Sequence, residues 1–210
     1  MIRIILSGEG NSDFGELDHL TKEFTPGPIA LLTENILAWH HKVDVSFKFR
    51  TRAELKRYPM TLKGKKKKTG IATGRGHSDL AYKLACVAKE NRCDVAILMR
   101  DARKSEYDTV YQEIKDGFSA AKFDSGIPAV PVPESEAWIV SCIVPERSHR
   151  VEDCSRDMKV ILEELLKSRN RPHNKETWCE ITAGCRVDSV KSPSFVQYTK
   201  DIEDVVKYLS

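Results

Sequence analysis

Nearly uninterrupted hydrophobic runs alternate along this chain with longer amphipathic segments. Residues 2–7 and 94–100 are such runs, and they predict strands that are buried on both faces. Residues 43–49 alternate between hydrophobic and polar positions, which indicates a half-buried strand. A further short strand is expected at residues 127–132.

Amphipathic segments between and after these strands predict helices. They are expected at residues 28–41, 78–91, 107–122, 133–143, 153–168 and 199–209. The last two helices are joined by a polar segment that contains Pro172 and Pro193. Strands that alternate with helices in this way are typical of an α/β fold with a mostly parallel sheet flanked by helices. The 210 residues correspond to one domain, or to one domain with a small appendage.

The hydrophobic pattern and the cysteines favour a cytoplasmic protein that does not contact a membrane. No stretch reaches the roughly 18–20 hydrophobic residues that a membrane span needs, and residues 1–7 are too short for a secretory signal. The six cysteines contain no Cys-x-x-Cys pair, and their spacings match no zinc ribbon or finger. Cys86 and Cys142 lie in hydrophobic helical patterns, where free thiols are common. We therefore expect reduced thiols.

Charge is distributed unevenly along the chain. The whole sequence has 34 Lys and Arg against 31 Asp and Glu, which gives a formal charge of +3. Residues 48–77 hold eleven basic residues and one acid, so this segment carries +10 and the remainder −7. The residues of its loop at 63–77 that are expected to bind a nucleic acid are Lys63, Lys65, Lys66, Lys67, Lys68 and Arg75. The alternative is a solvated, flexible loop that keeps the protein soluble.

Acidic residues follow three of the predicted strands. Glu9 and Asp13 follow the first strand, Asp101 follows the strand at 94–100, and Glu134 and Glu136 follow the last one. Ligand sites of parallel α/β sheets lie beyond the carboxyl ends of the strands, so we expect these carboxylates to lie together. Carboxylates held close together repel one another unless a cation is present, and hard oxygen ligands suit Mg²⁺ or Mn²⁺. Such an ion neutralises phosphate charge and activates water.

All of these acids except Glu9 also have a structural explanation. Glu134 and Glu136 lie in the first turn of a predicted helix, where the helix dipole favours acidic side chains. Asp13 and Asp101 are suitable N-cap residues for the helices that follow them. Glu9 lies between two glycines at the end of a strand, where it has no capping role.

Two histidines and three tryptophans have no clear functional context in the sequence. His40 and His41 are adjacent on a predicted helix without a partner at ligand spacing, so we expect them to be structural or exposed. Trp39, Trp138 and Trp178 are expected to serve packing rather than base stacking.

Four short motifs resemble a known family. Gly-Glu-Gly-Asn-Ser-Asp (8–13) and Met-Arg-Asp-Ala-Arg (99–103), each after a hydrophobic strand, resemble the Toprim domain of topoisomerases, primases, recombination proteins and overcoming-lysogenization-defect (OLD-type) nucleases. Pro-Val-Pro-Glu-Ser-Glu-Ala-Trp-Ile (131–139) and Ser-Pro-Ser-Phe (192–195) look like small stand-alone prokaryotic Toprim-like proteins. The resemblance implies a Toprim-like (Rossmann-like) metal-binding core at residues 1–145. Residues 146–210 would form a helical C-terminal extension packed on this core.

The resemblance also implies a function, namely Mg²⁺- or Mn²⁺-dependent hydrolysis of phosphodiester bonds in DNA or RNA. Glu9 matches the Toprim glutamate, a metal ligand or general acid/base, and Asp101 matches the first aspartate of the family's Asp-x-Asp. Asp13, Glu134 and Glu136 match positions at which OLD-type nucleases are rich in acids. A role in phage defence or mobile-element control, with a protein partner in a multi-component system, is further implied.

Arg103 departs from the family pattern, because it stands where the second aspartate of Asp-x-Asp is expected. Glu106 and Asp108 are the alternative sources of the missing carboxylate. We expect one bound metal rather than two, with the planar guanidinium of Arg103 at the scissile phosphate. The alternative function is a non-catalytic module that binds nucleic acid or a protein partner through a degenerate metal site. A third is an enzyme that acts on a small phosphorylated substrate.

Overall fold

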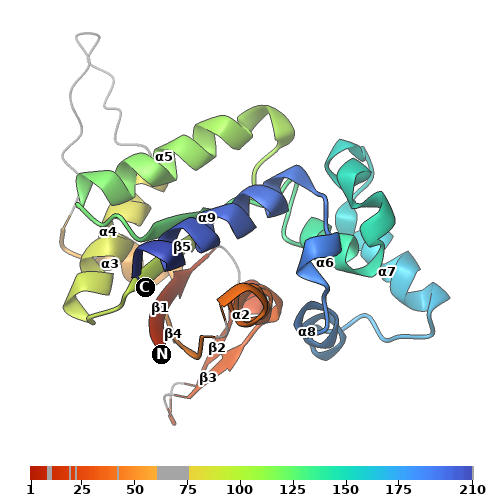
Figure 1. Cartoon of the computed structure of the whole chain (residues 1–210), viewed down its shortest axis with the longest axis horizontal. Helices are drawn as coiled ribbons and strands as arrows, with labels where there is room; N and C mark the ends of the chain where they lie inside the picture. The colour runs from red at the N-terminus through yellow and green to blue at the C-terminus, as the bar shows by residue number, and fades with distance from the viewer. Residues whose placement is uncertain (9–10, 19, 22, 42, 61–75, 210) are drawn as a thin grey trace.

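The molecule has an α/β fold built on a four-stranded parallel sheet (Figure 1). The computed structural model describes residues 1–8, 11–18, 20–21, 23–41, 43–60 and 76–209. The strand order is β4-β1-β5-β6, with β1 at Ile2–Ser7, β4 at Val45–Phe49, β5 at Val95–Met99 and β6 at Gly126–Ala129. All three pairings are parallel, so the expected mostly parallel sheet flanked by helices is confirmed.

The two central strands are buried on both faces, as their hydrophobic runs predict. Ile4 of β1 pairs with Val95 of β5, and every residue of β5 is buried. Successive side chains of a strand point to opposite faces. Ile4 and Ile97 accordingly belong to one hydrophobic cluster and Ile5 to the other.

Helices cover both faces of the sheet. One face packs against α3 (Arg52–Arg57), α4 (Gly76–Glu90) and α5 (Tyr107–Ala120), and the other against α2 (Pro28–His41) and α9 (Pro193–Leu209). In Figure 1, α4 and α5 accordingly lie across the sheet from α2. None of the helices in the described ranges is long and hydrophobic enough to span a membrane.

A smaller hydrophobic cluster lies beside the sheet, at the right of Figure 1. It is formed by α6 (Glu136–Ile143), α7 (Met158–Ser168) and α8 (Lys175–Ala183), together with the 3₁₀ helix η2 (Pro145–Asp153). The remaining short elements are α1 (Asn11–Phe14), the antiparallel pair β2 (Gly15–Leu17) and β3 (Phe24–Pro26), η1 (Lys104–Glu106) and η3 (Val187–Ser189). All six cysteines are free thiols.

Two of the sequence motifs meet around Trp138, which is fully buried in α6. Its indole Nε1 donates to Ser194 Oγ at 2.9 Å, and its ring packs edge-on against Phe195 and stacks on Tyr198. The segments at 131–139 and 192–195 are thus joined through the core. The C-terminal extension expected at 146–210 is helical, and α9 contributes Phe195 and Tyr198 to the hydrophobic cluster of the sheet.

Several predicted boundaries were wrong. The helix expected from residue 133 begins at Glu136, and the one expected from 153 begins at Met158, where Asp157 accepts a hydrogen bond from Lys159 N as N-cap. The helix expected from residue 199 begins at Pro193, because proline is favoured in the first turn of a helix. The polar segment around Pro172 is followed by α8, which was not predicted, and neither were α3 and the β2–β3 pair.

Candidate functional site

The predicted acidic residues follow strands that end at the same edge of the sheet. Asp13 lies in α1, after β1; Asp101 follows β5; and Glu134 follows β6 and precedes α6. The segments after β5 and β6 run side by side, since Arg100 N donates to Ala129 O at 2.9 Å and Ala102 N to Pro131 O at 3.2 Å. This carboxyl edge is where parallel α/β sheets place their ligand sites.

Close packing after β1 fixes the position of Asp13. A Cβ added to Gly8 would lie 3.0 Å from Phe14 Cδ2 and 3.4 Å from Met99 Cε, so only glycine fits at the exit of β1 without displacing these side chains. Phe14 is fully buried and anchors the short helix α1. Asp13 precedes this anchor and is therefore held at the edge of the sheet.

Ser135 joins two of the predicted carboxylates. Its hydroxyl lies 2.8 Å from Asp13 Oδ1 and 3.2 Å from Glu136 Oε2, and the residue is only 3% exposed. A serine hydroxyl carries one hydrogen and can donate it to one of the two oxygens at a time. Carboxylates from the exits of β1 and β6 thus converge on one donor, an arrangement that a proton or a cation would stabilise.

A lysine from α7 lies next to the acidic group, which consists of Asp13, Glu134 and Glu136. Lys159 Nζ, in α7, lies 3.5 Å from Glu134 Oε2 and 3.8 Å from Glu136 Oε1. Burial raises the pKa of the Glu134 carboxyl, the nearby Glu136 adds to this rise, and Lys159 opposes it. The attraction of Glu136 and then of Glu134 raises the pKa of Lys159, so its ammonium stays charged.

Asp101 and Arg103 lie on the segment between β5 and η1. Asp101 is half-buried, the Ala102 side chain is buried, and Arg103 is exposed just before η1. Glu106 and Asp108, the alternative sources of a second carboxylate, are both exposed at the start of α5. The structure records no contact between Arg103 and the carboxylates joined by Ser135 among the residues it describes. The role of Arg103 at a phosphate stays a prediction.

The described carboxylates do not by themselves form a metal site. Within the described ranges, no three His, Cys, Asp or Glu side chains are gathered so that they could hold a metal ion. Glu9 lies outside the described residues, as do all the basic residues predicted to bind nucleic acid, namely Lys63, Lys65, Lys66, Lys67, Lys68 and Arg75. The donor chemistry nevertheless suits a hard divalent cation, because the Asp13 and Glu136 side chains offer carboxylate oxygens close to the same hydroxyl.

The first turn of α4 lies at this edge. Residue 76 begins α4, and Arg100 Nε donates to His77 Nδ1 at 3.0 Å. Arg100 is the first residue after β5 and immediately precedes Asp101. His77, the last residue of the basic segment 48–77, is therefore bonded to the carboxyl edge at which Asp13, Asp101, Glu134 and Glu136 lie, which we call the acidic edge. The sequence alone did not reveal this contact.

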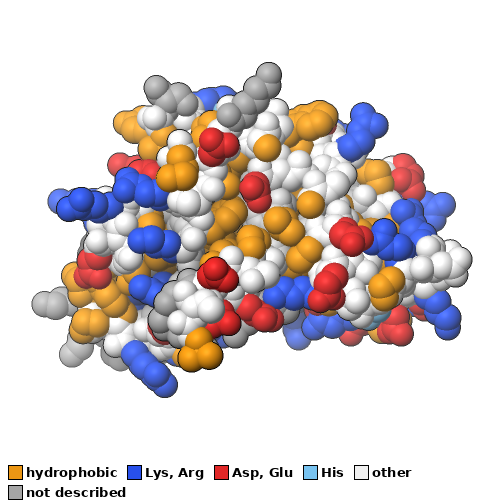
Figure 2. Space-filling view, turned by 90° about the horizontal axis from the view of Figure 1, so that it is seen from below, with side chains coloured by type: hydrophobic (Ala, Val, Ile, Leu, Met, Phe, Trp, Pro, Cys, Tyr) orange, Lys and Arg blue, Asp and Glu red, His pale blue; other side chains and the backbone are white. Residues whose placement is uncertain are grey.

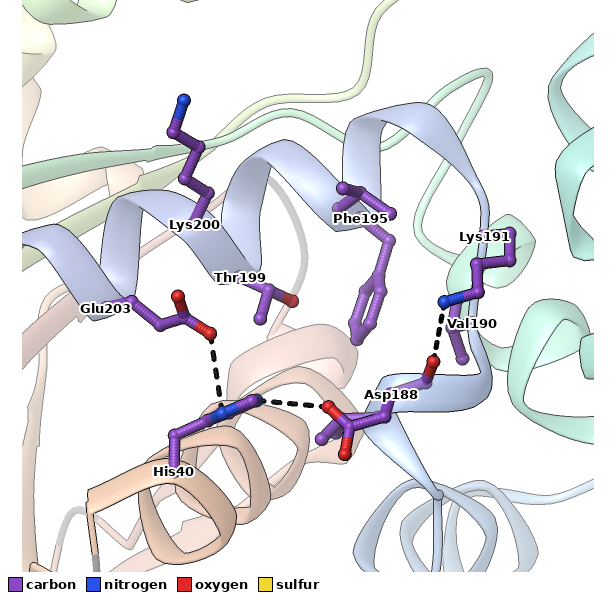
Figure 3. A pocket seen from close by; sticks show the side chains of 10 residues that line it. His40, Asp188, Val190, Lys191, Phe195, Thr199, Lys200 and Glu203 are labelled. Carbon is purple, nitrogen blue, oxygen red and sulfur yellow. Dashed lines mark hydrogen bonds and ion pairs between the residues drawn. The ribbon is translucent and has the colours of Figure 1, made fainter.

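His40 lines a pocket that lies apart from Asp13, Asp101, Glu134 and Glu136, and it has a structural role there. Its ring nitrogens lie 3.5 Å from Asp188 Oδ1 and 3.4 Å from Glu203 Oε1, so His40 joins α2 to η3 and α9 (Figure 3). The pocket between these elements has a volume of about 220 Å³, and Phe195 lies on its inner side. Trp39 Nε1 donates to Asp188 Oδ2 at 2.5 Å. None of the residues predicted for the acidic site lines this pocket.

Sequence reasoning missed Ser135 and Lys159. Ser135 stands inside a quoted motif but has no pattern that marks it as a bridge, and Lys159 comes from a helix whose local sequence does not point to residue 134.

Comparison with other proteins adds no family assignment: no protein-family model, no curated protein and no solved structure matches this chain.

Proposed function

We propose that this protein is a Mg²⁺- or Mn²⁺-dependent nuclease that hydrolyses phosphodiester bonds in DNA or RNA. One observation carries the proposal: the carboxylates of Asp13 and Glu136, which follow different strands, converge on the single hydroxyl of Ser135 at the carboxyl edge of the sheet. Acids held this close together repel one another, and a bound cation would offset that repulsion in addition to the Lys159 ammonium beside Glu136. The Toprim resemblance of residues 8–13 and 99–103 supports the same reading.

The ligands of the metal would be Glu9, Asp13, Asp101, Glu134 and Glu136. When bound, the ion would neutralise phosphate charge and activate a water molecule. Ser135 would keep the Asp13 and Glu136 carboxylates in place before a substrate arrives. Glu9, beside Gly8 at the exit of β1, would act as a ligand or as general acid/base.

Nucleic acid is the proposed substrate because of the basic segment. Lys63, Lys65 to Lys68 and Arg75 precede α4, whose His77 is bonded to Arg100 at the acidic edge. Positive side chains attract the phosphate backbone without regard to sequence. An exposed Arg103 would contact a phosphate beside Asp101.

The test is a cleavage assay with plasmid DNA, single-stranded DNA and RNA in the presence of Mg²⁺ or Mn²⁺. We expect the parent to cleave at least one of them, and Glu9→Gln, Asp101→Asn and Glu136→Gln to reduce the rate roughly 100-fold or more. Each substitution removes a charge with little change in shape. Glu163→Gln, at an exposed position in α7, is the matched control. Equal rates in the parent and the three variants would refute the assigned site.

A non-catalytic nucleic-acid-binding module is the second candidate. It is favoured by Lys159, which already places an ammonium beside Glu134 and Glu136, and by Arg103 in place of a second aspartate. Such a module would bind nucleic acid in a salt-dependent manner and would show no metal-dependent turnover. The cleavage assay therefore separates the two functions.

A further inference from the structure

The short helix α3 begins at the acidic edge and carries two exposed basic side chains in its last turn. We infer that, within the basic segment 48–77, Lys56 and Arg57 of α3 form a contact surface for the phosphate backbone of a nucleic acid, in addition to Lys63, Lys65 to Lys68 and Arg75. This inference rests on the proposed function, since it names a second part of the surface that would hold the same substrate.

The position of α3 follows from the end of β4. Arg50 N donates to Leu6 O at 3.0 Å, so the chain that leaves β4 lies against the end of β1. Thr51 then caps α3 at the carboxyl edge of the sheet. A helix of six residues is about 9 Å long, and α3 runs from this edge along α4. Lys83 Nζ donates to Lys56 O at 3.5 Å, and the hydroxyl of Tyr58, the C-cap, donates to Glu90.

The only acid of α3 serves the start of the helix. Glu54 Oε2 accepts hydrogen bonds from Thr51 N at 2.7 Å and from Thr51 Oγ1 at 3.0 Å, while Thr51 Oγ1 accepts from Glu54 N at 3.2 Å. This reciprocal capping box holds the carboxylate at the N-terminus of α3. Glu54 Oε1 also lies 4.0 Å from Arg50 Nη1, so among the described residues the contacts recorded for this carboxylate are with Arg50 and Thr51.

Burial of Leu55 orients the rest of the helix. Leu55 is 1% exposed and packs in the hydrophobic cluster that α4 and α5 form with the sheet. Lys56 and Arg57 follow it and are exposed, and among the described residues neither forms an ion pair with a carboxylate. Two positive charges therefore face solvent without a recorded counter-charge, in a chain whose remainder outside 48–77 is acidic.

The distances between the strand ends correspond to a few nucleotides of a backbone that would run along the acidic edge. Neighbouring strands lie about 5 Å apart, so the exit of β4 is roughly 5 Å from that of β1 and roughly 10 Å from that of β5. Nucleotides of one strand rise about 3.4 Å each along a duplex. Since Lys56 and Arg57 lie at the far end of α3, up to about 9 Å from the exit of β4, a backbone that they hold would reach Asp13 and Asp101 over roughly 10–20 Å, or about three to six nucleotides.

The experiment measures binding without cleavage. Fluorescence anisotropy with a labelled DNA duplex of about 20 base pairs, and with RNA of the same sequence, is recorded over a series of salt concentrations in EDTA. The test protein is Lys56→Gln/Arg57→Gln. The control is Lys122→Gln/Lys167→Gln, because both residues are exposed and lie outside residues 48–77, in the turn after α5 and in the last turn of α7.

We expect the α3 double variant to bind roughly tenfold or more weakly near 0.1 M salt, and the slope of log K against log salt to flatten by about 1.4–1.8. The control should bind as the parent does, and both variants should melt at the parent's temperature. An α3 variant equal to the parent in affinity and slope would overturn the inference. The inference would also be overturned if the parent protein bound vesicles containing phosphatidylserine but bound neither the DNA duplex nor the RNA. Binding as expected without Mg²⁺-dependent cleavage would refute the nuclease and leave the α3 surface standing.

Discussion

At the scale of single residues, Lys159 would weaken the proposed binding of a metal ion by Glu134 and Glu136. Its ammonium lies within 4 Å of both Glu134 and Glu136, so it would compete with a divalent ion for these carboxylates. We expect Lys159→Gln to tighten Mn²⁺ binding by roughly two- to fivefold, because an exposed ion pair contributes up to about 1 kcal/mol. Calorimetric titration with Mn²⁺ measures this change.

The control for this prediction is Lys167→Gln, at an exposed position in the last turn of the same helix. It should leave Mn²⁺ affinity unchanged. Weaker binding by Lys159→Gln would contradict the prediction and would mean that Lys159 holds Glu134 and Glu136 in position for the metal.

The candidate site shows what sequence patterns reveal about individual residues. Asp13, Glu134 and Glu136 were singled out because each follows a predicted strand, and the structure brings them together around Ser135 and Lys159. Ser135 and Lys159 escaped prediction because their contacts join residues far apart in the chain. Ser135 bonds to a residue 122 positions away, which no local pattern encodes.

At the scale of elements, the start of α9 depends on a glutamate from η2. Glu152 Oε1 accepts hydrogen bonds from Ser192 Oγ at 2.5 Å and from Ser194 N at 2.7 Å, and its charge faces the positive end of the helix dipole. We expect Glu152→Ala to lower the free energy of unfolding by about 1–2 kcal/mol, the range for loss of a helix cap. Urea denaturation followed by circular dichroism measures the change.

Glu146→Ala is the matched control for the α9 cap, because Glu146 is exposed on the same 3₁₀ helix. A difference between the two variants smaller than about 0.5 kcal/mol would show that the Glu152 contacts do not stabilise α9.

The same contacts explain why α9 was predicted to begin at residue 199, although it begins at Pro193. Its cap comes from Glu152, 42 residues before Ser194, whereas sequence rules search for caps next to the helix. The strands β2 and β3 were missed for another reason: each has three residues, too few to show an alternating pattern. The long hydrophobic runs of β1 and β5 were found because burial on both faces leaves a signal in consecutive residues.

At the scale of the whole molecule, charge separates one segment from the rest. Residues 48–77 carry +10 and the remaining residues −7. On the face shown in Figure 2, acidic and basic side chains of the described residues are interspersed around a central hydrophobic area. A polyanion is repelled by the acidic remainder and attracted by the basic segment, so its binding should depend on that segment and on salt.

The last prediction concerns the four consecutive lysines of this segment. Replacing Lys65, Lys66, Lys67 and Lys68 by Ala lowers the segment's charge from +10 to +6 and should weaken binding to every nucleic acid sequence alike. Each lost phosphate contact should flatten the salt slope by about 0.7–0.9. Because α3 would hold a neighbouring stretch of backbone, adding Lys56→Gln and Arg57→Gln should flatten the slope further by a separate increment. Anisotropy titrations of the parent, the two variants and their combination measure this additivity. If the four-lysine variant had the parent's affinity and slope, the lysines would be only a solvated loop, and the polyanion would have to be held elsewhere.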